Sequence, residues 1–385
     1  MKELSSSNET EREVYPKSFL DLVREVHDRG LCGRCGGCIS FCSASDIGAI
    51  GMTEDGPPVY INEDACLKCG ICYLVCPQTA ALDEDLKAKF AFKAPIGHVD
   101  NVYSTRAVAQ EVREAGTDGG VVTAILLALL EDGRIDGAIV CHNEGPFERV
   151  PTLARTPEEL LDAAGTHWDL VDHVEQLGKY STFIPVITEL RRVADEDMQR
   201  IAVVGVPCQI HSIRKMQALN IIPAHVVDYA LGLFCFESLA FDEDARRSLE
   251  EKFNFKFSDI VGMNIKDALY LKLRGDGDGA RVVRVPFEEL DAYVRPACRG
   301  CRDFSNHYAD ASFGGLGSPD GVTTVLVRTK VGREAYNLAR RKQRVEELDE
   351  LNTAVEKSKK MAAIVSQSKL KQARADRYAE THPVI

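Results

Sequence analysis

Apolar runs alternate with short glycine-rich and polar stretches through the middle of the chain. Residues 121–130 are apolar and follow the Gly119-Gly120 turn, so they predict a helix. Residues 156–165 predict a second helix, which Thr156 caps. Shorter apolar runs at residues 136–141, 201–206 and 230–236 predict buried strands. The alternation predicts a mixed sheet with helices packed against it.

The two ends of the chain follow other patterns. Residues 47–66 predict a short strand, a turn at Asp55-Gly56 and a second strand. Residues 333–380 are charged and contain neither Pro nor Gly, which favours helices. We expect a solvated helical hairpin there, and a docking arm for a larger complex is the alternative.

Length and charge narrow the classes of protein. A chain of 385 residues suits two or three domains. Asp and Glu outnumber Lys and Arg by 59 to 47, and no basic block stands out, so nucleic acid is not an expected partner. The polar N-terminus lacks the apolar region of a secretory signal, and residues 121–130 are too short to cross a bilayer. We expect a cytoplasmic protein without a transmembrane segment, which could lie peripherally on a membrane complex.

Eight of the 13 cysteines form two quartets of identical spacing. The C-x2-C-x2-C-x3-C pattern is that of bacterial ferredoxins, and clustered cytosolic thiols favour metal or redox roles over disulfides. The first quartet is Cys32, Cys35, Cys38 and Cys42, and the second is Cys66, Cys69, Cys72 and Cys76, which Pro77 follows.

The fourth cysteine of each run ligates the other cluster in two-cluster ferredoxins. This wiring assigns one 4Fe-4S cluster to Cys32, Cys35, Cys38 and Cys76, and a second to Cys66, Cys69, Cys72 and Cys42. A pair of structural zinc sites is the alternative, although each would need only two C-x2-C pairs.

Five cysteines remain outside the quartets. Cys208 and Cys235 each end an apolar strand-like run, and Cys298 and Cys301 form a C-x2-C pair. These four are candidates for a third cluster, while core packing is the alternative for the two at strand ends. Cys141 lies within a predicted strand, and we expect it to be a core thiol.

Five segments, in order between residues 100 and 330, resemble the family of beta subunits of coenzyme F420 hydrogenases and dehydrogenases. They are residues 116–129, 162–166, 203–217, 232–238 and 295–321. Because two ferredoxin-type clusters precede this core, the chain is most similar to the electron-input subunit of F420H2 dehydrogenase.

The resemblance implies a bound FAD with a 4Fe-4S cluster beside it, and coenzyme F420 as a diffusible substrate that exchanges a hydride at the flavin. Cys208, Cys235, Cys298 and Cys301 fall on the family's cysteine positions, which implies three clusters in all. The cofactor-binding residues that the resemblance implies are Gly119, Gly120, Val121, Thr123, Gly165, Thr166, Gln209, Gly317, Ser318 and Asp320.

Two basic residues beside this set are further candidates. Arg214 and Lys215 could provide counter-charges for the flavin phosphate or the acidic deazaflavin tail. A solvated helix face is the alternative for this pair.

The expected fold is α+β. An N-terminal bacterial-type ferredoxin domain with two 4Fe-4S clusters precedes a mixed α/β flavin-binding core and C-terminal helices. The expected boundaries are a polar tail at 1–22, the two-cluster ferredoxin-like domain at 23–95, the FAD and iron-sulfur domain at 96–330, and a charged helical extension at 331–385.

The favoured function is a flavin and iron-sulfur oxidoreductase. It would exchange a hydride with coenzyme F420 at FAD and pass single electrons through three clusters to or from a quinone-linked, heterodisulfide-reductase or hydrogenase type of complex. No side chain is assigned a catalytic role, because the flavin mediates the chemistry.

The chain departs from the family pattern at His167, Trp168 and Val322 and in residues 269–273. A second hypothesis therefore keeps FAD and the clusters but replaces coenzyme F420 by ferredoxin or another organic substrate. A third is a non-catalytic electron-relay subunit.

Overall fold

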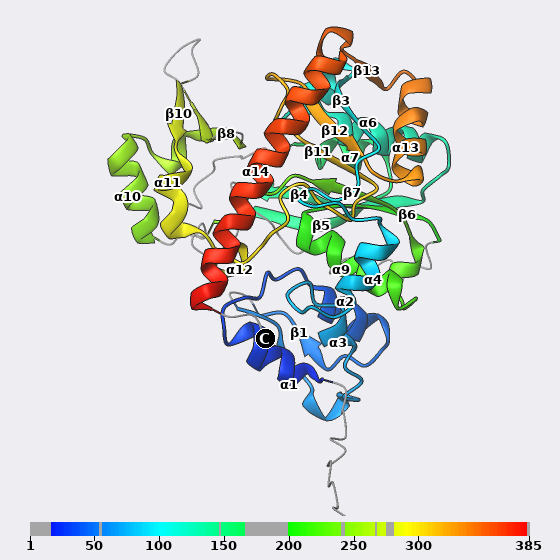
Figure 1. Cartoon of the computed structure of the whole chain (residues 1–385), viewed down its shortest axis with the longest axis vertical. Coiled ribbons are helices and arrows are strands. Elements are labelled where there is room, and N and C mark those ends of the chain that lie inside the picture. Colours follow the sequence, from blue (N-terminus) through cyan, green and yellow to red (C-terminus); the bar gives the residue numbers. More distant parts are fainter. Residues whose placement is uncertain are drawn as a thin grey trace, which may run out of the picture.

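The computed structural model of the chain describes residues 17–53, 56–145, 148–165, 199–239, 243–265, 268–274 and 281–382. Predicted features at Thr166, His167 and Trp168, and most of the polar N-terminal tail, lie outside these residues. An N-terminal lobe sits below a larger α/β core, a small sheet flanks the core, and a long C-terminal helix runs across it (Figure 1).

A mixed sheet forms the centre of the core and includes all three strands predicted from the sequence. Among the described residues it has eight strands, in the order β13 (Val345–Glu347), β3 (Asn101–Ala107), β12 (Thr323–Val327), β11 (Ala311–Gly314), β7 (Val227–Leu233), β6 (Ile201–Gly205), β4 (Gly137–Gly145) and β5 (Glu148–Ala154). Strands β11, β7, β6 and β4 are parallel, and the other pairings are antiparallel. The carboxyl ends of these four parallel strands therefore meet at one edge.

Helices cover both faces of this sheet. On one face lie the two helices that the sequence predicted, α6 (Val121–Glu131) and α7 (Pro157–Asp162), with α5 (Gln110–Ala115) and α13 (Lys330–Arg341). Helix α9 (Pro207–Ala218) covers the other face. Ala202 packs toward α6 and the next residue, Val203, toward α9, as the two-residue period of a strand requires.

The N-terminal lobe has its own small core. Its elements are α1 (Phe19–Leu22), a π-helical turn (Val23–His27), α2 (Gly37–Ala44), β1 (Ile50–Gly51), β2 (Val59–Tyr60), α3 (Ile71–Leu74) and α4 (Asp83–Lys89). The predicted hairpin is present, with Ile50 opposite Tyr60. Phe19 is 1% exposed, so the lobe begins before the expected boundary at residue 23.

A second, smaller sheet packs beside the core and has no counterpart in the sequence-based expectation. Its order is β10 (Arg281–Val285), β9 (Leu269–Leu273) and β8 (Ile260–Ile265), covered by α10 (Glu243–Phe253) and α11 (Phe287–Leu290). Leu269, Leu271 and Leu273 point into its own apolar core.

The prediction of a solvated C-terminal hairpin is wrong. Strand β13 joins the edge of the large sheet, and Tyr336 of α13 is 1% exposed. Helix α14 (Ala354–Thr381) crosses the core diagonally toward the N-terminal lobe (Figure 1). Its buried side chains recur every three or four positions: Lys360, Ile364, Ser368, Lys371 and Ala375. In the described part of the chain, no helix is long and apolar enough to cross a membrane.

Candidate functional site

The two ferredoxin-type quartets adopt the same local conformation. Gly36 and Gly70 follow the second cysteine of each loop and hold left-handed φ angles of 84° and 76° as N-caps of α2 and α3. Arg34 and Lys68, two residues earlier, also have positive φ, at 54° and 52°. Left-handed backbone favours glycine, so the glycine after each C-x2-C pair has a structural reason.

The structure brings together the crossed groups of thiols that the sequence predicted. Burial raises the pKa of the Cys76 thiol, and the neighbouring Cys35 and Cys32 raise it further, which groups Cys76 with the first loop. Burial likewise raises the pKa of Cys72 to about 12, to which three thiols contribute: Cys69, Cys66 and Cys42.

A third group of thiols assembles at the carboxyl edge of the large sheet. Cys208 lies in the first turn of α9 after β6, and Cys235 follows the adjacent parallel strand β7. Cys298 lies in the short helix α12 (Pro296–Arg299), and Cys301 follows its end. Burial raises the pKa of Cys208 well above its ordinary value, with further contributions from Cys35, Cys235, Cys301 and Cys298. The other thiols of the third group therefore lie close to Cys208, and so does Cys35 of the first ferredoxin group.

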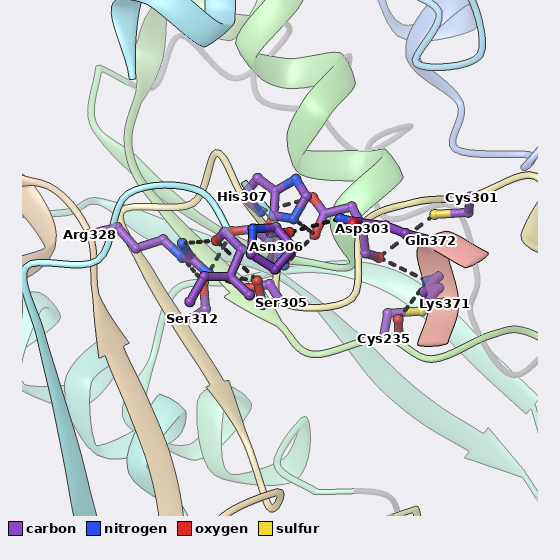
Figure 2. A network of polar contacts seen from close by, with 12 residues as sticks. Cys235, Cys301, Asp303, Ser305, Asn306, His307, Ser312, Arg328, Lys371 and Gln372 are labelled. Atoms are coloured by element: carbon purple, nitrogen blue, oxygen red, sulfur yellow. Dashed lines mark hydrogen bonds and ion pairs between the residues drawn. The ribbon is translucent and has the colours of Figure 1, made fainter. Parts of the chain in front are cut away.

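Buried polar contacts brace the loops of this third group (Figure 2). The Asn306 side-chain amide donates to the carbonyl oxygens of Gly205 at 2.9 Å and Leu233 at 3.3 Å, just before Cys208 and Cys235 respectively. The Asp303 carboxylate accepts from the main-chain N–H of Asn306 at 2.7 Å. These bonds tie three separate loops into one unit.

Helix α14 adds two cations to the same region. Lys371 donates through Nζ to the carbonyl oxygens of Cys235 at 2.7 Å and Asp303 at 2.8 Å. Burial lowers the pKa of Lys371, but the acidic groups of Cys301, Cys235, Cys298 and Asp303 nearby outweigh this and raise the pKa overall. Arg374 pairs with Glu237 and donates to the carbonyl oxygen of Cys298 at 3.2 Å.

These thiol groups differ from a site for one metal ion. Among the described His, Cys, Asp and Glu side chains, no three converge as ligands of a single ion would. The four thiolates of a 4Fe-4S cluster bind different iron atoms, so a cluster does not require that convergence. A buried ammonium beside the third group also fits an anionic occupant, because burying an unpaired cation is unfavourable.

A cavity of about 300 Å³ opens beside the third group of thiols. It lies at the carboxyl edge of β4, β6, β7 and β11, where open α/β sheets bind ligands. Its wall includes Cys235 itself and the first turn of α6. Its aromatic lining consists of Phe234, Phe236, Phe304 and Phe313.

The N-terminus of α6 suits a phosphate-bearing ligand, because free main-chain amides point away from a helix start. Gly119 and Gly120 both have positive φ, at 76° and 67°. A Cβ on Gly120 would approach the Val112 carbonyl oxygen to 2.3 Å, so this glycine is also required for packing.

The cavity gathers only part of the predicted flavin set. Five of those residues line it: Gly120, Val121, Thr123, Gly165 and Gln209. Gly119 lies directly behind the wall, against Gly321 and Thr323. Gly317, Ser318 and Asp320 follow the lining segment that ends at Leu316, outside the cavity wall. The Ser318 hydroxyl instead lies 2.8 Å from that of Ser104.

The structure does not bring Arg214 and Lys215 to the cavity. Arg214 donates to the carbonyl oxygen of Tyr308 at 2.9 Å and pairs with Asp310 at 2.9 Å. Lys215 is fully buried and donates to the carbonyl oxygen of Cys76 at 2.9 Å. Neither side chain lies on a solvated helix face.

Several lining residues escaped the sequence analysis. Cys141, expected to be a core thiol, is partly exposed and lines the cavity. Asn264 of β8 donates to the Asp118 carboxylate at 3.1 Å, so the small sheet contributes to the wall. Val322, where the family pattern is broken, is 5% exposed and lies behind Thr323, which lines the cavity. Asp118 precedes the Gly119-Gly120 turn directly, and this position in the sequence could have identified it as a residue of the cavity wall.

Comparison with known proteins identifies the family. Residues 198–353 and 102–178 match the C-terminal and N-terminal parts of the coenzyme F420 hydrogenase/dehydrogenase beta subunit, and residues 59–80 match a 4Fe-4S binding domain. The chain is 30% identical to the beta subunit of coenzyme F420 hydrogenase of Methanosarcina barkeri, over 63% of this chain and 80% of that one. The chain belongs to the family of coenzyme F420 hydrogenase/dehydrogenase beta subunits.

Other family members show how the fold is shared. One subunit of the F420H2 dehydrogenase of Methanosarcina mazei is 29% identical, over 83% of this chain and 85% of that one. Coenzyme F420-dependent sulfite reductase of Methanocaldococcus jannaschii is 30% identical over 86% of this chain, which spans 49% of that protein. A structure of the F420-reducing [NiFe] hydrogenase complex from Methanosarcina barkeri superimposes with a TM-score of 0.63 at 28% identity, over 75% of this chain and 94% of that one.

Membership fixes the general class of the protein. It is an F420-related oxidoreductase subunit with an iron-sulfur binding segment near its N-terminus.

Proposed function

We propose that this subunit exchanges a hydride with coenzyme F420 at an FAD bound in the cavity and relays single electrons through three 4Fe-4S clusters. The observation that supports this most directly is the position of Cys235, which belongs both to the cavity wall and to the third group of thiols. A ligand bound in the cavity would therefore lie beside the third group of thiols, where the electron relay would begin.

The neighbouring thiol groups support one order for the proposed relay. The third group, at Cys235, adjoins the cavity, and Cys208 adjoins Cys35 of the first ferredoxin group. Cys38 of that group adjoins Cys72 of the second ferredoxin group. Cys69 of the second group is exposed, so electrons would reach a partner subunit there.

The protein's own groups would hold the flavin by three kinds of contact. The first turn of α6 offers amides to the phosphates, the phenylalanines pack against flat rings, and Gln209 and Thr123 supply polar contacts. When bound, a flavin supplies the exchange between a two-electron hydride carrier and one-electron clusters.

Two features fit a role within a larger complex. Leu67 is 71% exposed and Ile61 is 67% exposed, and both lie close in sequence to the exposed Cys69. Exposed apolar side chains around an electron exit suit contact with another redox subunit. We include the partner complex and a cytoplasmic, peripheral location in the proposal.

The experiment is an anaerobic titration of the purified protein with reduced coenzyme F420, following flavin bleaching while iron and FAD are quantified. We expect rapid bleaching with about twelve iron atoms and one FAD per chain. FAD and iron present without any bleaching would refute coenzyme F420 as the hydride partner and direct the search to ferredoxin or another organic donor. Absence of FAD would refute the catalytic role and favour a plain electron relay.

A further inference from the structure

Lys371 is a buried lysine on the C-terminal helix α14. It is 1% exposed, although it lies on a helix whose neighbouring Lys369 is exposed. Figure 2 shows it beside Cys235, with Cys301 close by. Its two acceptors are the main-chain carbonyls of Cys235 and Asp303, at 2.7 and 2.8 Å.

A nearby negative charge would stabilise this buried ammonium group. Carbonyl oxygens satisfy its hydrogen bonds but leave a full positive charge out of water, which is strongly unfavourable. Within the described part of the chain, Lys371 forms no ion pair with a carboxylate. The nearby groups that can carry negative charge are the cysteines Cys301, Cys235 and Cys298 and the Asp303 carboxylate.

Lys215 provides an internal comparison. Its Nζ also donates to the carbonyl of a thiol-bearing residue, Cys76, at 2.9 Å. It differs from Lys371 because the Asp83 carboxylate lies 3.0 Å away and offsets its charge. Among the described residues, Lys371 has no carboxylate paired with it in this way, so the groups near its charge include the cysteines of the third group.

We propose that Lys371 raises the reduction potential of the cluster held by Cys208, Cys235, Cys298 and Cys301. The inference rests on the proposed function, because it requires that cluster. Reduction adds one electron and makes the cluster more negative by one charge, so a fixed cation stabilises the reduced form more than the oxidised form. The electron comes from the flavin and leaves to the next cluster, so the step needs no further reactant.

The raised potential would favour one direction of electron flow. A raised potential at the cluster beside the cavity favours removal of single electrons from the flavin. Lys371 would act through its charge and position alone, without contact with coenzyme F420. Its effect should therefore appear in the potential of one cluster and leave the other two unchanged.

The test is a redox titration of the anaerobic holoprotein, followed by electron paramagnetic resonance. Lys371→Met removes the charge and keeps the length of the side chain, and Lys369→Met makes the same change at an exposed position of α14. A Cys298→Ser variant identifies which signal belongs to the third cluster. We expect a lower midpoint potential for that signal in Lys371→Met and no shift in Lys369→Met.

The possible results distinguish a failure of the third cluster from a failure of the role of Lys371. If no signal of the wild-type protein depends on Cys298, the third cluster and the proposed relay fail. If the signal is present and Lys371→Met leaves its midpoint unchanged, the cluster stands and the role of Lys371 is overturned. Should Lys371→Met lose iron, Lys371→Gln and Lys371→Arg are measured in its place. A larger shift of the midpoint potential in Lys371→Gln than in Lys371→Arg supports the proposal, and equal midpoint potentials in the two variants refute it.

Discussion

The ion pair between Arg374 and Glu237 attaches α14 to the wall of the cavity. The two side chains are 17% and 5% exposed, so solvent screens their charges little. Arg374 also donates to the carbonyl oxygen of Cys298 at 3.2 Å and lies over the Phe236 ring, 5.2 Å from its centre. Replacing Arg374 by Met removes these contacts and leaves the buried Glu237 carboxylate without its ion-pair partner.

The expected loss of folding stability follows from the unpaired charge of Glu237. Breaking a buried ion pair by removing one partner costs about 3–5 kcal/mol, and we take about 4 kcal/mol. An unfolding entropy of about 2.1 cal/mol/K per residue gives roughly 0.8 kcal/mol/K for a chain of 385 residues. Arg374→Met should therefore lower the melting temperature by about 5 °C when the whole chain melts cooperatively.

The assay is thermal unfolding of the anaerobic holoprotein at one pH and one scan rate, with iron content measured in each variant. Arg377→Met, at an exposed position of the same helix, is the control and should leave the melting temperature unchanged within about 1 °C. Adding Glu237→Gln to Arg374→Met should recover a large part of the loss, because the unpaired Glu237 charge is then absent. A double variant as unstable as Arg374→Met, with equal iron content, would refute the reasoning.

Three further predictions concern the cavity, a buried histidine and the electron exit. Thr123→Phe should fill the cavity and reduce bound flavin at least about tenfold with iron unchanged, while Thr123→Ser retains flavin, as measured by flavin release. Burial lowers the pKa of His307 to about 4, so the folded protein binds fewer protons than the unfolded chain between pH 6.5 and 4. The melting temperature should fall as pH falls through this window, and less steeply in His307→Gln. Leu67→Asp should slow electron delivery to the partner complex while flavin bleaching by reduced coenzyme F420 stays unchanged, as stopped-flow measurements would show.

Local patterns allowed much of the fold to be predicted. The glycine turn before α6, the Thr156 cap of α7 and the apolar runs of β4, β6 and β7 are each encoded within a few residues. The cysteine spacing of the N-terminal lobe is also local, because each loop supplies three thiols within seven residues. Such features depend on backbone conformation and short-range periodicity, which the sequence displays directly.

The parts that the sequence did not predict depend on distant partners. Arg214 and Lys215 suggested anion binding, yet their acceptors lie on residues far along the chain, Tyr308 and Cys76 among them. Arg328 is 3% exposed and donates to the carbonyl oxygens of Ile96, His98 and Ser305. No local pattern distinguishes such an arginine from one on the surface, since its acceptors are main-chain carbonyls of other loops.

The buried face of α14 shows why a charged sequence misled the prediction. Lysines are normally exposed, so a helix rich in them is expected to face water. The inward face of α14 nevertheless includes Lys360 and Lys371, and the latter donates to the carbonyl oxygens of Cys235 and Asp303. Lys215, on a different helix, is buried in the same way beside Cys76. The inward face of α14 thus combines apolar side chains such as Ile364 with lysines that donate to main-chain carbonyls, so hydrophobic periodicity alone did not predict its burial.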